Sequence, residues 1–152
     1  MYQRILVPVD GSATSERGLR EAIRLARLTH ADLRLIHVID ELSFAIGIDS
    51  CGYYAGELLD LLRANGADIL RQATEQVRAQ GVPVSSVLYE NLEKTVQQRV
   101  IDEAGEWRAD LIVLGTHGRR GVRRLALGSS AERILRSAPV PVLLVRAPED
   151  GA

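Results

Sequence analysis

The chain has 152 residues, 46% of them hydrophobic, and its 19 basic and 20 acidic side chains leave a formal net charge of −1. This length suits one domain with a single buried core, and the nearly balanced charge argues against nucleic acid as a partner. We expect no membrane span, since no apolar run approaches about 18 residues, and we expect no signal peptide and no structural metal. Cys51 is the single cysteine, so we expect a cytoplasmic protein without an internal disulfide.

The first third of the chain predicts two strands with a helix between them. Residues 4–10 (RILVPVD) form a short β-branched apolar run that is typical of a buried strand. The segment GSATS then interrupts the pattern, and Thr14 or Ser15 is positioned to cap a helix. A second strand is predicted over residues 31–39.

A long connection and a long helix follow. Residues 40–56 exceed the usual loop length, so we consider a lid over a ligand, a partner surface or an inserted segment. Periodic leucines predict a helix over about 57–80, and Gly81 is suited to ending it. Residues 83–89 then predict a third, weaker strand.

The last third predicts two more strand and helix pairs. A helix is expected over residues 92–107 and a strand over 109–116. After a glycine-rich loop, a short helix is expected over 130–137 and a final strand over 140–146.

Alternating strands and helices of this kind build a parallel sheet with helices on both faces. We predict a single α/β domain over residues 1–147, with five strands in the order 3-2-1-4-5 and a polar tail over 148–152. In such open sheets ligands bind beyond the carboxyl ends of the strands where the winding reverses, here between the first and fourth strands.

The segment GTHGRRGVRRLALGSS, residues 115–130, follows the fourth strand at this point. Without β-carbons, Gly115 and Gly118 let the backbone approach a ligand or adopt positive φ. The letters SSAE predict a capping box in which Ser129 accepts from the N–H of Glu132. A helix that begins at Ser130 would then offer free N–H groups to an anion such as phosphate. The alternative is a tight turn with no ligand.

Two common nucleotide-binding motifs are missing. The chain has no GxxxxGK[ST] segment, which excludes a P-loop, and no GxGxxG after the first strand, which argues against dinucleotide binding. A serine- and glycine-rich SGGxDS loop, found in adenylating enzymes of related fold, is also absent after the first strand.

The spacing Gly115-x2-Gly118-x9-Gly128-Ser129 resembles the G-x2-G-x9-G-[ST] signature of the ATP-binding universal stress proteins. The opening RILVPVDGSATSERGLREAIRLA and the closing APVPVLLVR are similar to the ends of that family. The resemblance implies a Rossmann-like fold similar to the adenine nucleotide alpha hydrolases. It also implies an adenine nucleotide, a cytoplasmic location, and a homodimer.

The resemblance also implies site residues. It assigns the base and ribose to Pro8, Val9, Asp10 and the backbone of Val38, and the ribose and phosphates to Leu114, Gly115, Gly118, Gly128, Ser129 and Ser130. Asp10 would hold a ribose hydroxyl, an adenine N–H or Mg²⁺, or else act as a buried cap. Val38 and Leu114 are alternatively plain core residues.

The arginines of the loop are less strongly indicated as phosphate ligands than the glycines are. Arg119 can reach a phosphate, whereas Arg120, Arg123 and Arg124 are expected to face solvent or acids, because neighbouring residues point apart. His117 lacks the partners of a catalytic residue, so no catalytic residue is assigned.

The favoured function is a regulatory, stress-response protein that binds ATP with Mg²⁺ and hydrolyses it slowly or not at all. The alternatives are a weak ATPase and a dimeric interaction module that needs no nucleotide. The last strand, residues 140–146, is apolar on both faces and lies at the predicted edge of the sheet, which favours antiparallel pairing of two copies.

Overall fold

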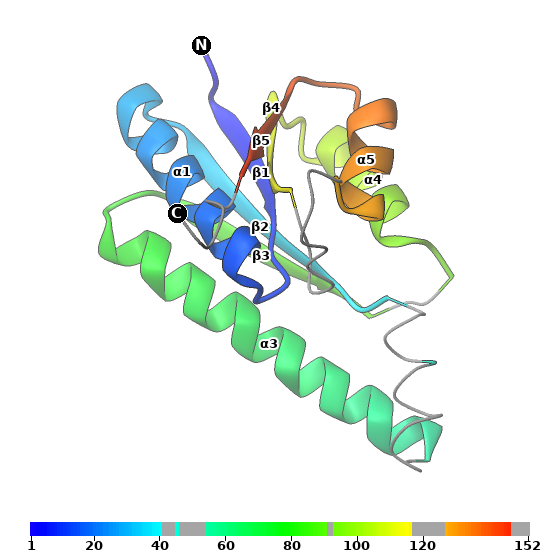
Figure 1. Cartoon of the computed structure of the whole chain (residues 1–152). Helices are drawn as coiled ribbons and strands as arrows, with labels where there is room; N and C mark the ends of the chain where they lie inside the picture. Colours follow the sequence, from blue (N-terminus) through cyan, green and yellow to red (C-terminus); the bar gives the residue numbers. More distant parts are fainter. Residues whose placement is uncertain (41–44, 46–53, 91–92, 117–126, 147–152) are drawn as a thin grey trace, which may run out of the picture.

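Five parallel strands form one sheet in the computed structural model, which describes residues 1–40, 45, 54–90, 93–116 and 127–146 (Figure 1). The strands are β1 (Arg4–Pro8), β2 (Asp32–Val38), β3 (Val84–Tyr89), β4 (Leu111–Gly115) and β5 (Val142–Val145). Their order is β3-β2-β1-β4-β5, with every neighbouring pair parallel. The predicted topology is confirmed, including the reversal of winding between β1 and β4.

Helices cover both faces of the sheet, as predicted. They are α1 (Ala13–Thr29), α3 (Ala55–Ala79), α4 (Val96–Glu106) and α5 (Ser129–Ser137). Figure 1 shows α1 and α3 on one face and α4 and α5 on the other. These helices run antiparallel to the strands, so α4 and α5 both begin at the carboxyl edge of the sheet (Figure 1).

The two cores follow from the alternation of side chains along each strand. On β1, Ile5 and Val7 are fully buried beneath α1 and α3, whereas Leu6 is fully buried beneath α4 and α5. On β4, Leu111 and Val113 join the first core, and Ile112 and Leu114 the second. The central strands are therefore apolar on both faces, which explains their unbroken hydrophobic runs.

The first helix begins at Ala13, before the residues that were predicted to cap it. Ser12, rather than Thr14 or Ser15, is the N-cap of α1, and its hydroxyl accepts a hydrogen bond from the Ser15 N–H at 3.2 Å. Four residues, 9–12, connect β1 to α1, and Gly11 adopts a φ of +80° in this turn, which its missing β-carbon permits. Thr14 and Ser15 consequently lie buried in the first turn of the helix.

Other boundaries differ by a few residues. The helix α3 begins at Ala55, and Gly81 with a φ of +73° follows its end as predicted. The helix α4 begins only at Val96 because Thr95 caps it. The tail over 148–152 and most of the 40–56 segment, including Cys51, lie outside the described residues. Within the described chain, no helix is both long and apolar enough to cross a bilayer.

Candidate functional site at the carboxyl edge of the sheet

A cleft of about 400 Å³ opens at the carboxyl ends of β1, β2 and β4, and the first residues of α4 and α5 form part of its wall. This is the place where the winding of the sheet reverses. Its volume lies within the range of small-molecule sites. Nine of the eleven predicted site residues line it: Pro8, Val9, Asp10, Val38, Leu114, Gly115, Gly128, Ser129 and Ser130. Gly118 and Arg119 lie outside the described residues, as do His117, Arg120, Arg123 and Arg124.

Asp10 is held at the cleft by the turn that follows β1. Its carboxylate Oδ1 accepts a hydrogen bond from the Ser12 N–H at 2.8 Å, and its own N–H donates to the Ser15 hydroxyl at 3.1 Å. Asp10 is half-buried, and Ser12 caps α1, so Asp10 is not a buried cap. Its carboxylate is thus a fixed negative group at one end of the cleft.

The side chains of Val38 and Leu114 belong to the core beneath α4 and α5, as the alternative interpretation expected. Leu114 is only 4% exposed, and Val38 packs against the same cluster. Both residues nevertheless line the cleft. Their contribution to a bound molecule is therefore an apolar wall and the adjoining backbone.

His37 is a lining residue that the sequence analysis missed. Its side chain is 7% exposed, and its Nδ1 lies 2.7 Å from the Val9 carbonyl oxygen. Gly66 of α3 makes room for the ring, because a Cβ there would lie 2.8 Å from the His37 Cδ2 atom. A histidine beside Val38 at the end of the second strand was the available signal.

Three further polar residues reach the cleft from helices. Asn65 comes from α3, Gln97 from the first turn of α4, and Arg133 from α5. Arg133 is exposed, and no ion pair engages it among the residues that the structure describes. Periodicity alone could not select these residues, because polar side chains at such positions usually face solvent.

The start of α5 differs from the predicted capping box. The helix begins at Ser129 rather than Ser130, Gly128 is its N-cap, and no side chain caps it. The Glu132 carboxylate instead pairs with Arg136 at 2.8 Å. The Gly128 N–H donates to the Thr116 carbonyl at 2.7 Å, which fixes the entry to the helix.

An N-terminus of this kind retains its donors. In the described part of the chain, no hydrogen bond occupies the N–H groups of Ser129 and Ser130, and both residues line the cleft. Such groups, together with the helix dipole, form a site for an anion. The start of α5 therefore has the free N–H groups that the sequence analysis expected there, although its capping differs from the prediction.

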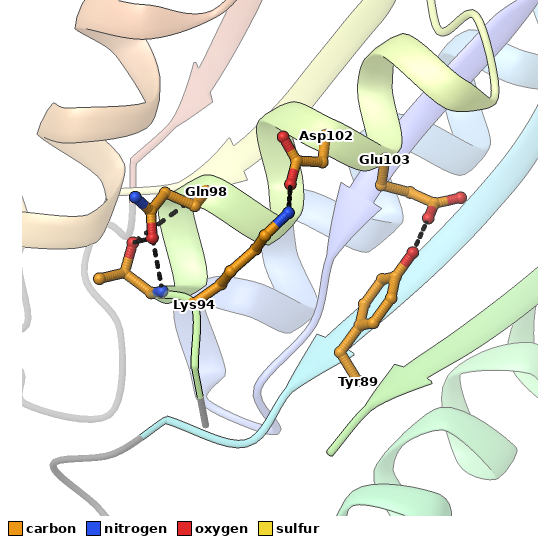
Figure 2. A network of polar contacts seen from close by, with 6 residues as sticks. Tyr89, Lys94, Gln98, Asp102 and Glu103 are labelled. Carbon is orange, nitrogen blue, oxygen red and sulfur yellow. Dashed lines mark hydrogen bonds and ion pairs between the residues drawn. The ribbon is translucent and has the colours of Figure 1, made fainter. Parts of the chain in front are cut away.

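The start of α4 has the capping box that α5 lacks. The Thr95 hydroxyl accepts from the Gln98 N–H at 3.3 Å, and the Gln98 side-chain oxygen accepts from the Thr95 N–H at 2.9 Å (Figure 2). The N–H groups of Thr95 and Gln98 are thus both hydrogen-bonded by side chains of the same helix end. The two neighbouring helices thus present different N-termini to the same cleft.

Polar side chains also tie the body of α4 to the sheet. Glu103 is only 2% exposed and accepts a hydrogen bond from the Tyr89 hydroxyl (Figure 2). A carboxylate oxygen of Glu103 also lies 2.5 Å from the Arg34 Nε atom. Burial, followed by the bond to Glu103 and its charge, raises the pKa of Tyr89 to about 12. Lys94 pairs with Asp102 at 2.6 Å on the outer surface.

Gly115 lines the cleft, but its missing side chain is required by the protein itself. A Cβ at Gly115 would lie 2.4 Å from the Thr14 carbonyl oxygen. Gly18 of α1 faces it, and a Cβ there would lie 3.1 Å from the Gly115 nitrogen. The two glycines allow α1 to pack closely on β4. Of the two alternatives considered for Gly115, positive φ does not apply, because the described glycines with positive φ are Gly11 and Gly81.

Within the described residues, no group of three or more His, Cys, Asp or Glu side chains is placed to hold a metal ion. A cation in the cleft would therefore depend on the two carboxylates that line it, Asp10 and Asp40, and on oxygens of a bound ligand. Mg²⁺ is commonly held in this way, by one or two carboxylates together with substrate phosphates.

Comparison with known proteins identifies relatives along nearly the whole chain. The sequence model of the Universal stress protein family matches residues 1–146. Universal stress protein MJ0531 of Methanocaldococcus jannaschii is 34% identical over 150 residues, which are 98% of this chain and 85% of that protein.

Solved structures agree with these relationships. A protein of the universal stress protein family from Burkholderia pseudomallei has a TM-score of 0.77 and 36% identity, over 96% of this chain and 97% of that one. The universal stress protein from Archaeoglobus fulgidus in complex with dAMP has a TM-score of 0.68 and 26% identity, over 94% and 97% of the two chains.

Proposed function

The chain belongs to the universal stress protein family, and we propose that it is a member that binds ATP together with Mg²⁺ in the cleft at the carboxyl ends of β1, β2 and β4. The relative in complex with dAMP supports an adenine nucleotide as the class of ligand. The family supports a role in the stress response and a cytoplasmic location.

One observation carries the proposal: the uncapped N-terminus of α5 and the Asp10 carboxylate line the same cleft. The first attracts phosphate through its free N–H groups and dipole. The second would repel phosphate directly, so it suits a hydroxyl donor of the ribose or a cation that bridges to the phosphates. A molecule with an anionic end and a hydroxyl-bearing centre fits this arrangement.

Further residues are consistent with a triphosphate. Arg133 lies on the first turns of α5 and would add a positive charge close to Ser129 and Ser130. Gly118, which the family resemblance assigns to the ribose and phosphates, and Arg119, which can reach a phosphate from the loop, remain part of the proposal. The apolar wall that includes Val9, Val38 and Leu114 would receive the base.

We expect a regulatory nucleotide-binding protein with slow hydrolysis at most. Fast phosphoryl transfer requires a positioned nucleophile and metal, and no catalytic residue is assigned. Turnover should lie far below the roughly 1 s⁻¹ that marks the slow end of ordinary enzymes. Rapid phosphate release that Asp10→Ala abolishes would instead establish an ATPase.

A homodimer through β5 is the second part of the proposal. The strand β5 lies at the edge of the sheet, and the Leu143 side chain is 37% exposed. An apolar edge strand invites pairing with a second copy about a two-fold axis. Leu143→Lys would place like charges near that axis and should favour monomers. Light scattering that gives a monomeric mass for the wild type at micromolar concentration, with or without ATP, contradicts the dimer.

The direct test of the ligand is mass spectrometry of the small molecules that heat releases from the purified protein. ATP or a related adenine nucleotide, in an amount comparable to the protein, is the expected result. If none is released and titration with ATP and Mg²⁺ also gives no heat of binding, the nucleotide-independent interaction module becomes the correct function.

A further inference from the structure

Gln97 places an unpartnered polar atom at the wall of the cleft. It is the second residue of α4, lines the cleft, and its Oε1 atom is buried without a hydrogen-bond partner among the described residues. The next residue, Gln98, is engaged in the capping box through its Oε1 atom. The contrast shows that α4 satisfies one glutamine internally and leaves the other unsatisfied.

The surroundings make this atom unusual. Val96, Val100 and Ile134 line the cleft from α4 and α5 and belong to the second core or pack against it. A buried amide oxygen beside such apolar groups costs free energy unless it accepts a hydrogen bond. Native proteins satisfy most buried polar atoms, so an exception that lines a cleft calls for a partner from outside the protein.

The chemistry of the proposed ligand restricts what can satisfy this oxygen. The phosphates of a nucleotide are acceptors and cannot donate to a carbonyl oxygen. Its donors are the exocyclic amino group of the base and the hydroxyl groups of the ribose. The oxygen of Gln97 is therefore complementary to the nucleoside half, whereas the N-terminus of α5 is complementary to the phosphates.

We infer that Gln97 is a specificity-determining residue, whose Oε1 atom accepts a hydrogen bond from the nucleoside half of the bound adenine nucleotide. This inference rests on the proposed nucleotide site. It adds a residue of α4 to a site whose predicted members come from the strand ends and the glycine loop. It also explains why the first turn of α4 carries a glutamine whose Oε1 atom is buried without a partner next to Val96 and Val100 of the cleft wall.

The test is a titration of wild type and Gln97→Met with four ligands: ATP, 2′-deoxy-ATP, 3′-deoxy-ATP and purine riboside triphosphate, which lacks the amino group. Methionine keeps the length and removes the acceptor. Wild type should prefer ATP over one analogue by about fivefold or more, and that analogue identifies the donor. Gln97→Met should bind ATP about fivefold to tenfold more weakly, and the same preference should fall to within twofold.

Controls separate this inference from the function on which it rests. Gln72→Met, an exposed change on α3 away from the cleft, should leave all four affinities at wild-type values. Ligand-free Gln97→Met should melt at the wild-type temperature or above, because a buried unpartnered amide is removed.

A Gln97→Met protein that retains every wild-type preference overturns the inference, whether or not its melting temperature falls. In that case the oxygen serves water or the fold alone. A wild type that binds none of the four ligands instead overturns the proposed nucleotide function, and the inference with it.

Discussion

The helices α4 and α5 both begin at the wall of one cleft, but a side chain caps the N-terminus of α4 and none caps the N-terminus of α5. The start of α4 is closed by the Thr95–Gln98 capping box, and its body is tied to the sheet through Glu103. The start of α5 has a glycine cap and no side-chain bond. Among the described residues, the N-terminus of α4 is capped within the protein, although the Gln97 Oε1 and Arg99 Nε atoms of this helix are buried without a hydrogen-bond partner, whereas the first turn of α5 keeps its free N–H groups.

This difference supports placing the phosphates of the proposed nucleotide at the start of α5 rather than at the start of α4. A capped helix end contributes stability but has little left to offer an anion. An uncapped end at the surface of a cleft gives up that stability and retains an anion site. The glycines of the signature also differ in role. Gly115 serves packing, because it makes room for the backbone of α1, whereas Gly128 leaves the start of α5 without a capping side chain.

The largest expected effect comes from Gly115→Ala. Its new Cβ would meet the Thr14 carbonyl at 2.4 Å, so the backbone of α1 or β4 must move. We expect a loss of about 3 kcal/mol or more in the free energy of unfolding, at the upper end of overpacking effects. Urea denaturation measures it. Gly105→Ala is the matched control, since nothing lies within 4 Å of its Cβ. Equal stability of the two variants would contradict the packing role of Gly115.

Tyr89→Phe weakens the tie between the sheet and α4. Loss of a hydrogen bond to the buried Glu103 carboxylate should cost about 1.5–3 kcal/mol at neutral pH. The raised pKa of Tyr89, about 12 against 10, means that folding favours its neutral form. Its contribution is therefore complete below pH 10 and is lost as the pH rises toward 12.

Urea denaturation of wild type and Tyr89→Phe between pH 7 and pH 12 tests this dependence. The difference in unfolding free energy should stay constant up to about pH 9.5 and then decrease. Tyr54→Phe, on a side chain that is 79% exposed, should change stability by less than about 0.5 kcal/mol at neutral pH. A difference between wild type and Tyr89→Phe that grows above pH 10 has the wrong sign for this mechanism.

Gly128→Asp would give α5 the kind of cap that α4 has. The φ of −54° and ψ of 147° at Gly128 are open to any residue, so the fold should persist. The carboxylate would occupy a free N–H group and repel phosphate, so ATP affinity should fall tenfold or more, about 1.4 kcal/mol. The melting temperature of the free protein should rise slightly, because aspartate caps a helix better than glycine by a few tenths of a kcal/mol. Undiminished affinity in calorimetry would place the phosphates elsewhere.

Gln98→Ala has the smallest expected effect and, unlike Gly128→Asp, should lower stability while leaving ATP affinity nearly unchanged. It removes one half of the capping box on an exposed side chain, which should cost about 0.5–1 kcal/mol of stability. Gln98 does not line the cleft, so ATP affinity should stay within twofold. Thermal melting and calorimetry on the same sample measure both quantities. A large loss of affinity with unchanged stability would reverse the roles assigned to the two helix ends.

Sequence reasoning predicted the sheet and its ligand edge because both depend on strong local patterns. Alternating strands and helices limit the topology, and the carboxyl edge follows from the reversal of winding. Capping was less predictable, because SSAE fits a capping box as well as TxxQ does. Only the backbone at Gly128 decides that Ser129 lies inside α5. The glycine spacing likewise could not reveal that Gly115 contacts Thr14, a residue 101 positions earlier in the chain.

The helical side of the cleft was also hidden from the sequence. Gln97 and Arg133 reach the cleft from helices that look like ordinary amphipathic segments. Their approach depends on how α4 and α5 pack on the sheet, which is a tertiary property. A polar residue in the first turn of a helix predicts a cap or a solvated surface equally well.

The central claim, that the open N-terminus of α5 holds the phosphates of an adenine nucleotide, is tested most directly by calorimetric titration of ATP and Mg²⁺ into wild type and Gly128→Val. The branched side chain would occupy the space that phosphate must approach, while the extended backbone at this position accepts valine. We predict that the variant keeps the wild-type fold by circular dichroism and binds at least tenfold more weakly. Equal affinities for the two proteins would contradict the claim.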